Sequence, residues 1–169
     1  MHRVTAIGLV TAACLALGAC GQSGQDAIAQ RGESPAVLTA ATLGEQSILS
    51  AADYLAGAVY LNADASRGQA LAMQCRACHS LERGGASIVG PNLFGIFGRS
   101  AGSDDDFAYS EALAGSDFVW TPRALDAWLA QPFAFLPGNR MSFPGLPASD
   151  DRNALIAYLL QHTDSGDDE

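Results

Sequence analysis

The clearest periodic pattern of apolar and polar residues lies in "WTPRALDAWLAQP", and it predicts a helix between Thr121 and Pro132. Thr121 is a good N-cap, Pro122 fits the first helical position, and Pro132 cannot continue the helix. The residues on its apolar face are Leu125, Trp128 and Leu129. We expect this face to point into the core of a folded domain.

Two more helices are predicted in the same region. Ser149, with Asp150 and Asp151, opens the last one, whose apolar stripe consists of Leu155, Tyr158 and Leu159. Ser66 is placed to cap a helix that runs into Cys75. The segments between the helices are rich in Gly and Pro and show no strand-like alternation. Residues 64–162 are therefore predicted to form one loop-rich, all-α domain, followed by an acidic tail over 163–169.

The first 63 residues follow a different pattern. An uncharged apolar run over 4–19 follows Arg3; it is too short to span a bilayer and ends in small residues, which is typical of an export signal over 1–19. The sequence "LGAC", ending at Cys20, resembles the lipobox of bacterial lipoproteins, in which the cysteine sulfur carries a diacylglycerol. The alternative is an ordinary secretory signal that leaves Cys20 as a free thiol.

Residues 20–63 are expected to be a lipid-anchored linker. Their first part is polar and glycine-rich, which favours a flexible leash. Further on, apolar residues at helical spacing predict a short helix over 46–61, although Gly57 weakens it. The residues of this spacing are Ile48, Ala52, Leu55 and Val59.

The charge of the chain restricts its partners. The formal net charge is −9, all the basic residues are arginine, and removal of Arg3 with the signal would make the charge −10. An acidic protein of this kind is a poor ligand for nucleic acid or for anionic lipid headgroups. Attachment to a membrane would therefore depend on the acyl chains at Cys20.

The stretch "AMQCRACHSL" contains Cys75, Cys78 and His79 in a CxxCH motif. A disulfide framework is not expected, because Cys14 would leave with the signal and Cys20 would carry the lipid. Only Cys75 and Cys78 then remain, and there is no second cysteine pair. Zinc would need further ligands, and a thioredoxin-type dithiol would need strands beside the motif. In an exported chain, CxxCH is typical of covalent haem attachment. A haem would also supply the core that so small and loop-rich a domain lacks.

A second axial ligand to haem iron must be His or Met, and the exported chain offers Met73, Met141 and His162. Met73 lies beside Cys75, too close in sequence to reach the other haem face. His162 ends the last helix and is expected to be solvated. Met141 follows a Pro-Gly turn in "FLPGNRMSFPG" and is therefore the candidate; the alternative is that it only fills the core.

Six strings of the chain resemble class I cytochromes c of the mitochondrial and cytochrome c2 branch: "CRACHS", "GPNLFGIFGR", "AYSEAL", "VWT", "FLPGNRM" and "LIAYL". The match runs without a gap from Cys75 to Tyr158. The resemblance implies a small fold in which the first and last helices cross and the loops wrap around one covalent haem c. It also implies His79 and Met141 as iron ligands.

The resemblance assigns the other site residues in the same register. The carbonyl of Pro91 would accept a hydrogen bond from His79, Asn139 belongs to the loop of Met141, and Gly68 and Leu71 would meet the last helix at Leu155 and Tyr158. The residues implied as donors to a buried haem propionate are Arg99, Tyr109 and Trp120. Two positions depart from the mitochondrial protein: Leu113 replaces an Asn, and Trp128 replaces a Tyr beside the Met sulfur. We expect a drier pocket there, in which Trp128 can still donate a hydrogen bond.

The expected function is that of a one-electron carrier and not an enzyme, on the periplasmic side of a Gram-negative inner or outer membrane. The resemblance implies transfer from a cytochrome bc1-type complex to a terminal oxidase. Two alternatives remain. One is a dedicated electron-accepting subunit of a periplasmic dehydrogenase, which a pull-down at high salt would reveal. The other is a peroxidase or gas-binding haem protein, which carbon monoxide binding to the reduced protein would reveal.

Docking to partners is expected to differ from that of the mitochondrial protein, whose exposed haem edge is ringed by lysines. Arg76 and Arg140 remain near this edge. Several other lysine positions are apolar here, namely Ala86, Ile88, Phe133, Ala134 and Pro147. An apolar partner surface, with a basic rim to suit the acidic chain, would fit this pattern. Alternatively, Phe133 folds inward.

Overall fold

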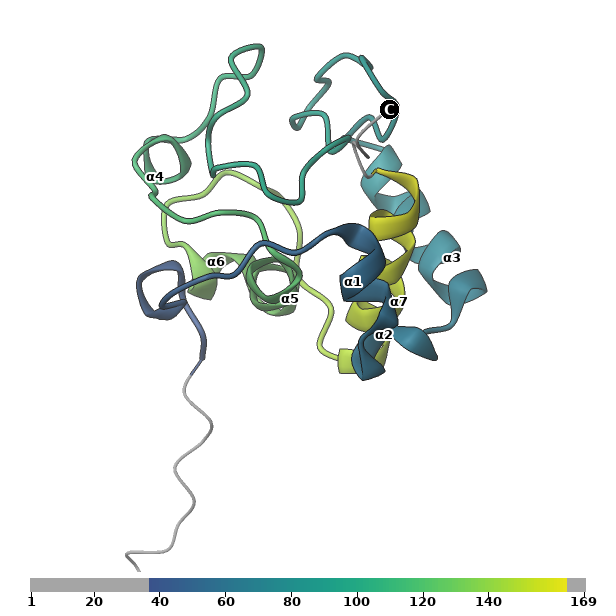
Figure 1. The fold of residues 1–169 in the computed structure, drawn as a ribbon. Coiled ribbons are helices and arrows are strands. Elements are labelled where there is room, and N and C mark those ends of the chain that lie inside the picture. Colours follow the sequence, from purple (N-terminus) through teal and green to yellow (C-terminus); the bar gives the residue numbers. More distant parts are fainter. Residues whose placement is uncertain (1–36, 164–169) are drawn as a thin grey trace, which may run out of the picture. The chain divides into compact units, whose positions relative to one another are not determined.

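A computed structural model describes residues 37–163, and these residues form helices joined by long loops (Figure 1). The predictions of an export signal over 1–19, a lipid on Cys20, a flexible leash in the polar stretch after it and a tail over 164–169 lie outside the described residues. Within 37–163 the extended structure is limited to an isolated antiparallel bridge between Ser100 and Val119, so the all-α prediction is confirmed. No helix in this range is long and apolar enough to cross a membrane.

The elements, in chain order, are η1 (Ala40–Thr42), α1 (Ala51–Ala56), α2 (Ala58–Leu61), α3 (Ala65–Arg76), α4 (Glu111–Ala114), α5 (Pro122–Ala130), α6 (Pro132–Phe135) and α7 (Ser149–His162). The start of α5 is as predicted: the Thr121 side chain accepts a hydrogen bond from the Ala124 N–H, and Pro122 is the first helical residue. The start of α3 differs from the prediction that Ser66 caps it. The cap is Asp64, whose Oδ1 accepts a hydrogen bond from the Arg67 N–H at 3.0 Å. Ser66 instead donates to that carboxylate.

The helices α3 and α7 pack closely against each other, as expected for the first and last helices of the domain. Gly68 makes this approach possible, since a Cβ placed there would lie only 2.3 Å from the carbonyl oxygen of Ala154 and 2.9 Å from Cβ of Tyr158. Leu71 and Leu155 are buried at the same contact. The predicted contact between these helices is present.

Helix α7 is buried over a continuous run from Ala154 to Leu160, not along a single stripe. The reason is that α3 and α5 do not cover it alone: α1 and α2 also pack against it, as Figure 1 shows. Every side of the middle of α7 therefore meets protein. Its sequence accordingly carries apolar residues all round the helix in this stretch.

The segment from residue 37 to 63 corrects two expectations. The predicted helix over 46–61 is interrupted at Gly57, whose backbone is extended (φ −67°, ψ 145°), so that α1 and α2 are separate. Residues 37–63 are also not a linker outside the domain, because Leu43 is buried in the hydrophobic core and α1 and α2 contact α7. Apolar side chains on the segment find a partner surface on the domain, which a sequence pattern alone does not reveal.

Candidate functional site

Cys75, Cys78 and His79 share the helical turn that ends α3. The backbone N–H groups of Cys78 and His79 both donate to the carbonyl of Cys75, at 3.0 and 2.8 Å. Both cysteines are free thiols and partly buried, and burial raises the pKa of the Cys75 thiol. The motif therefore presents two thiols and one imidazole from a single turn at the edge of the core.

The imidazole of His79 is held by the loop that follows it. Its Nδ1 lies 2.7 Å from the carbonyl oxygen of Pro91, the partner that the resemblance implies. A carbonyl only accepts, so Nδ1 carries the proton and Nε2 is left with a free lone pair for a metal. Burial lowers the pKa of His79, while the Pro91 hydrogen bond opposes this shift. The neutral ring that a metal requires is thus favoured by its surroundings.

Gly90 is a site residue to which the sequence analysis gave no role, although it lies in the matched string "GPNLFGIFGR". A Cβ at this position would lie 2.2 Å from Cε1 of His79 and within 2.7 Å of both ring nitrogens. Only glycine lets the backbone pass so close to the ring. A glycine directly before the proline that accepts from the histidine is the signal that could have indicated it.

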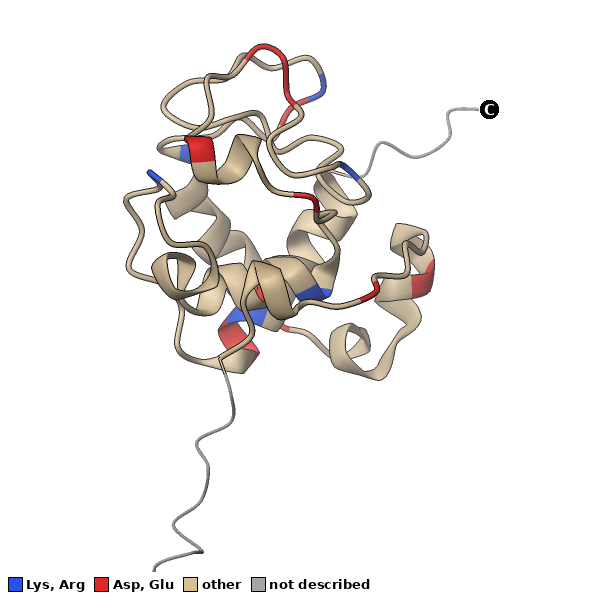
Figure 2. Ribbon diagram, turned by 90° about the vertical axis from the view of Figure 1, so that its left-hand side faces the viewer, with Lys and Arg blue, Asp and Glu red and all other residues tan. Residues whose placement is uncertain are grey.

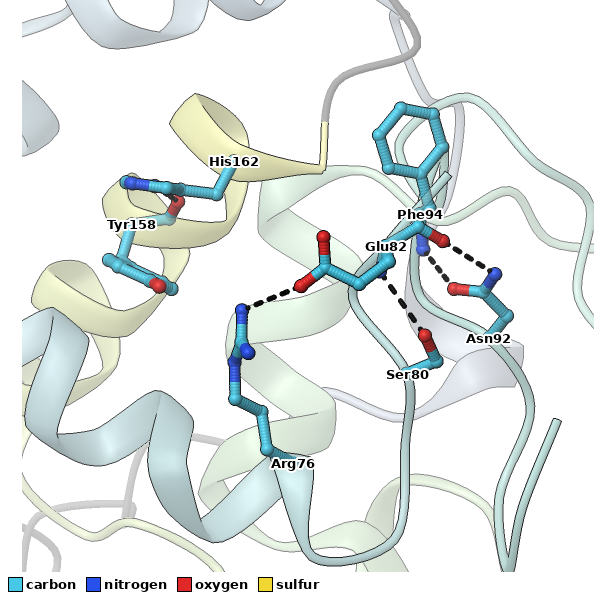
Figure 3. Close-up of polar contacts among 7 residues, drawn as sticks. All are labelled: Arg76, Ser80, Glu82, Asn92, Phe94, Tyr158 and His162. Carbon is cyan, nitrogen blue, oxygen red and sulfur yellow. Dashed lines mark hydrogen bonds and ion pairs between the residues drawn. The ribbon is translucent and has the colours of Figure 1, made fainter. Parts of the chain in front are cut away.

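Asn92 fixes the loop between His79 and Phe94. Its side-chain amide donates to the carbonyl of Glu82 at 3.0 Å, and its Oδ1 accepts from the Phe94 N–H at 2.8 Å (Figure 3). The amide also donates to the carbonyl of Gly85 at 2.7 Å. Arg76 pairs with Glu82 at 3.1 Å in the same view. The loop is therefore ordered by the chain's own polar contacts, and it holds Pro91 in place. The sequence analysis did not assign this role to Asn92.

Met141 lies in the loop between α6 and α7 and is partly buried. Its Sδ accepts a hydrogen bond from Nε1 of Trp128 at 3.2 Å, as expected if Trp128 can still donate. Its backbone N–H donates to Oδ1 of Asn139 at 3.0 Å. The buried Asn139 amide donates in turn to the carbonyls of Pro132 and Leu136, at 2.9 and 2.8 Å. Met141 is therefore fixed at two points, by Asn139 at its backbone and by Trp128 at its sulfur.

The three residues implied as propionate donors gather around one loop. The backbone N–H of Trp120 donates to the carbonyl of Arg99 at 2.9 Å, which joins the two ends of the loop. The guanidinium of Arg99 donates to the carbonyl of Asn92 at 2.8 Å. Burial raises the pKa of Tyr109, and the nearby positive charge of Arg99 lowers it. Arg99 and Tyr109 are thus close enough to interact, and the Trp120 backbone is paired with that of Arg99.

The two other candidate axial donors do not lie in this site. The Met73 side chain is 63% exposed on α3. His162 is exposed at the end of α7, where its ring stacks on Tyr158 at 4.0 Å between centroids (Figure 3). Its Nδ1 lies 2.8 Å from the Tyr158 carbonyl.

The donor set fits a large apolar cofactor that carries a metal. One turn supplies two thiols and an imidazole, and a distant loop supplies a thioether. Half-buried apolar side chains lie at the margin of the core. These side chains are Leu93, Phe97, Leu113, Leu136 and Phe143. In the part of the chain that the structure describes, no group of three or more His, Cys, Asp or Glu is arranged to hold a metal ion. The residues thus suit a haem better than a bare zinc ion.

Known proteins with similar sequences support the same assignment. The chain is 41% identical over 100 residues to cytochrome c2 of Agrobacterium tumefaciens, a match that covers 57% of this chain and 90% of that protein. It is 38% identical over 103 residues to cytochrome c2 of Rhodoblastus acidophilus, covering 61% and 96%. It is 42% identical over 101 residues to cytochrome c of Chlamydomonas reinhardtii, covering 59% and 90%. No protein-family model matches the chain.

Proposed function

The chain belongs to the cytochrome c family, and from this premise we propose that it is a membrane-tethered carrier of single electrons on the periplasmic side of a Gram-negative bacterial membrane. Proteins of this family are electron carriers and not enzymes, and they bind one covalent haem c, for which Cys75 and Cys78 form the CxxCH attachment motif. The haem supplies the one-electron couple. The chain's own residues hold it, shield it and set its potential.

We propose His79 and Met141 as the axial ligands. The observation that supports this most strongly is that each donor has its own fixing hydrogen bond, from His79 to Pro91 and from Trp128 to Met141. The Pro91 carbonyl fixes the tautomer of the imidazole and increases its basicity. The Trp128 N–H withdraws electron density from the sulfur and fixes its direction. With both residues bound, the iron of the haem would have no position open to a substrate, as suits a carrier.

Arg99, Tyr109 and Trp120 are proposed to hold a haem propionate by charge and hydrogen bonding. An unpaired carboxylate in a partly apolar site would carry a large desolvation penalty. The positive charge of Arg99 would offset this penalty and favour the ionised carboxylate. Leu113 offers no polar group, so we expect a drier pocket beside the proposed Met ligand than an Asn would give.

The tether is proposed to be a lipid on Cys20, because the export signal ends in the lipobox-like "LGAC". Cys20→Ser is expected to release the protein from membranes into the periplasmic fraction, with an unchanged visible spectrum. The physical reason is that the described domain begins at Val37 and its site residues all lie beyond residue 74. Fractionation followed by absorption spectroscopy measures both effects.

Wild-type protein is the control for that fractionation. If Cys20→Ser stays tightly bound to membranes, the lipid is not the anchor. The exposed apolar side chains of the 46–61 segment would then be the candidates for membrane contact. These side chains are Ile48, Leu49, Val59 and Leu61, each at least 50% exposed.

We propose that the carrier runs between a cytochrome bc1-type complex and a terminal oxidase, and that it docks through an apolar surface. Phe133 is 56% exposed and does not fold inward, and Ile88 is 61% exposed. Ala86, Ala134 and Pro147 are exposed as well. Figure 2 shows long uncharged stretches between the charged positions of the ribbon.

The two arginines near the expected haem edge are engaged within the chain. Arg76 pairs with Glu82, and Arg140 donates to the carbonyl of Ala108. They are therefore less available to a partner than the lysines of the mitochondrial protein. An apolar partner surface, with basic groups at its rim to suit the acidic chain, fits these features best.

Electron transfer to the native partner is expected to change little between low and physiological salt, because apolar contacts are not screened. Phe133→Asp should slow the bimolecular rate about tenfold, the effect of losing roughly 1.4 kcal/mol at the contact. Val59→Asp is the matched control, since it places the same charge on a side chain that is 59% exposed on α2. Stopped-flow kinetics at several salt concentrations measure the rates. A steep fall with rising salt, or equal slowing by both variants, would contradict this docking surface.

A further inference from the structure

The segment from Thr39 to Leu49, here called the strap, is attached to the domain by a buried side chain and by a backbone hydrogen bond, both at Leu43. Leu43 is 2% exposed and belongs to the same hydrophobic cluster as Phe118 and Trp120. Its carbonyl accepts a hydrogen bond from Nη1 of Arg123 on α5 at 2.9 Å. Figure 1 shows the strap crossing beside α5 on its way from η1 to α1.

Gln46 makes the most specific contact of the strap. Its Oε1 accepts from the Val119 N–H at 2.9 Å, and its Nε2 donates to the Val119 carbonyl at 2.7 Å. Nε2 also lies 3.0 Å from Oγ1 of Thr121, to which it donates. The glutamine amide has one carbonyl and one NH2, so it pairs with Val119 as a peptide group of a neighbouring strand would.

The segment around Val119, residues 118–120, pairs along its other edge with residues 99–101. The Ala101 N–H donates to the Phe118 carbonyl, and the Trp120 N–H to the Arg99 carbonyl, both at 2.9 Å. Ser100 and Val119 form the bridge between them. Val119 directs its own N–H and carbonyl away from this bridge, toward Gln46. Gln46 therefore completes the pairing of a short extended segment that would otherwise have an open edge.

This pairing closes the loop over residues 101–118. Arg99 and Trp120 stand at its two ends, and Tyr109 lies within it. Ile48 of the strap lies over the same closure, because its Cγ2 would be 3.5 Å from a Cβ built on Gly98. The strap thus contacts both backbone segments from which the loop departs.

We propose that the strap is a positioning element for the propionate edge of the haem site, with Gln46 as its positioning residue. By fixing Val119, Gln46 fixes the adjacent Trp120 and, through the paired backbone, Arg99. The proposed role of Gln46 is therefore indirect and acts through Val119. The inference rests on the proposed role of Arg99, Tyr109 and Trp120, and it assigns a function to a segment that was expected to be part of the lipid-anchored linker.

The test is Gln46→Ala in the haem-loaded protein, with amide hydrogen exchange measured by NMR. The amides of Ala101, Val119 and Trp120 are expected to exchange about tenfold faster. The hydrogen bonds between Gln46 and Val119 are lost, and a net loss of about 1.4 kcal/mol raises the population of the open, exchanging state about tenfold. The amides of Leu71 and Leu155, in α3 and α7, should keep their rates. Glu45→Ala, which changes the exposed neighbour of Gln46, is the matched control and should change none of them.

The second readout is the reduction potential and its dependence on pH. Water admitted at the propionate edge favours the oxidised form, so Gln46→Ala should have a lower reduction potential. The pH dependence of that potential, to which the propionate carboxyl would contribute, should shift to higher pH because the groups that stabilise the ionised carboxylate are held less firmly. Gln46→Glu should behave no better than alanine, because its carboxylate cannot donate to the Val119 carbonyl. Leu43→Ala should give the same local pattern by loosening the strap from the core.

Uniformly faster exchange throughout the domain, with an unchanged potential, would show that the strap serves only general stability and would overturn the proposal. Unchanged exchange at Val119 would overturn it as well. Both measurements use the isolated protein without membrane or partner. They therefore do not depend on the proposed lipid tether or on the proposed electron-transfer partners. If either of those proposals fails, the result on the strap still stands.

Discussion

Met141→Ala is expected to abolish the sulfur-to-iron charge-transfer band in the near-red spectrum of the oxidised protein. The reduced protein should then bind carbon monoxide at neutral pH, which the wild-type protein should resist. The reduction potential should fall by roughly 0.1–0.3 V, within the range of about 0.8 V over which axial ligands tune haem iron. Thioether ligation favours the reduced state, and alanine offers no replacement.

The structural reason to expect this result from Met141 is the way its sulfur is held. Trp128 donates to Sδ, and Asn139 accepts from the backbone of the same residue. Asn139 is only 6% exposed and is fixed by two carbonyls of its own loop. A methionine that merely filled the core would need no donor aimed at its sulfur.

Met73→Ala is the matched control, because it removes the same side chain from an exposed position on α3. It should leave the band, the potential and the resistance to carbon monoxide unchanged. If Met73→Ala removes the band and Met141→Ala does not, the assignment of the ligand is wrong. If neither variant affects it, the sixth ligand is not a methionine, and the exposed His162 would have to be tested.

Gly68→Ala is expected to destabilise the folded protein by about 2 kcal/mol or more. The new methyl group would lie 2.3 Å from the carbonyl oxygen of Ala154 and 2.9 Å from Cβ of Tyr158, so α3 and α7 must separate. Overpacking of this kind typically costs about 1–3 kcal/mol, and more where backbone cannot yield. The gain in helix propensity, about 1 kcal/mol, offsets only part of this. Denaturant unfolding of the haem-loaded protein measures the difference.

Gln69→Ala tests whether the effect belongs to the helix contact. Gln69 is exposed on the same helix, and its replacement should change stability by no more than about 0.5 kcal/mol. A stable Gly68→Ala protein, with stability equal to that of Gln69→Ala, would mean that α3 and α7 do not approach as closely as the structure shows.

Much of the helical framework could be predicted because the signals are local. The cap at Thr121 and the proline that follows it depend on neighbouring residues alone, and the structure has both. The start of α3 was predicted less well, since Asp64 and Ser66 are both good caps and only their mutual geometry decides. Here Ser66 donates to the Asp64 carboxylate, which leaves Asp64 to accept from the helix backbone.

The composition of the site was determined by the sequence itself: a CxxCH motif, a methionine after a Pro-Gly turn, and a register that supplies Pro91 and Arg99. Covalent attachment and metal ligation require particular side chains, and these are visible without a structure. Tertiary structure alone decided how the residues are held. That Gly90 must lack a side chain, that Trp128 reaches Met141, and that Gln46 pairs with Val119 all depend on contacts between segments distant in the chain or on exact backbone distances. No local pattern encodes such contacts, because they arise only when packing brings the segments together.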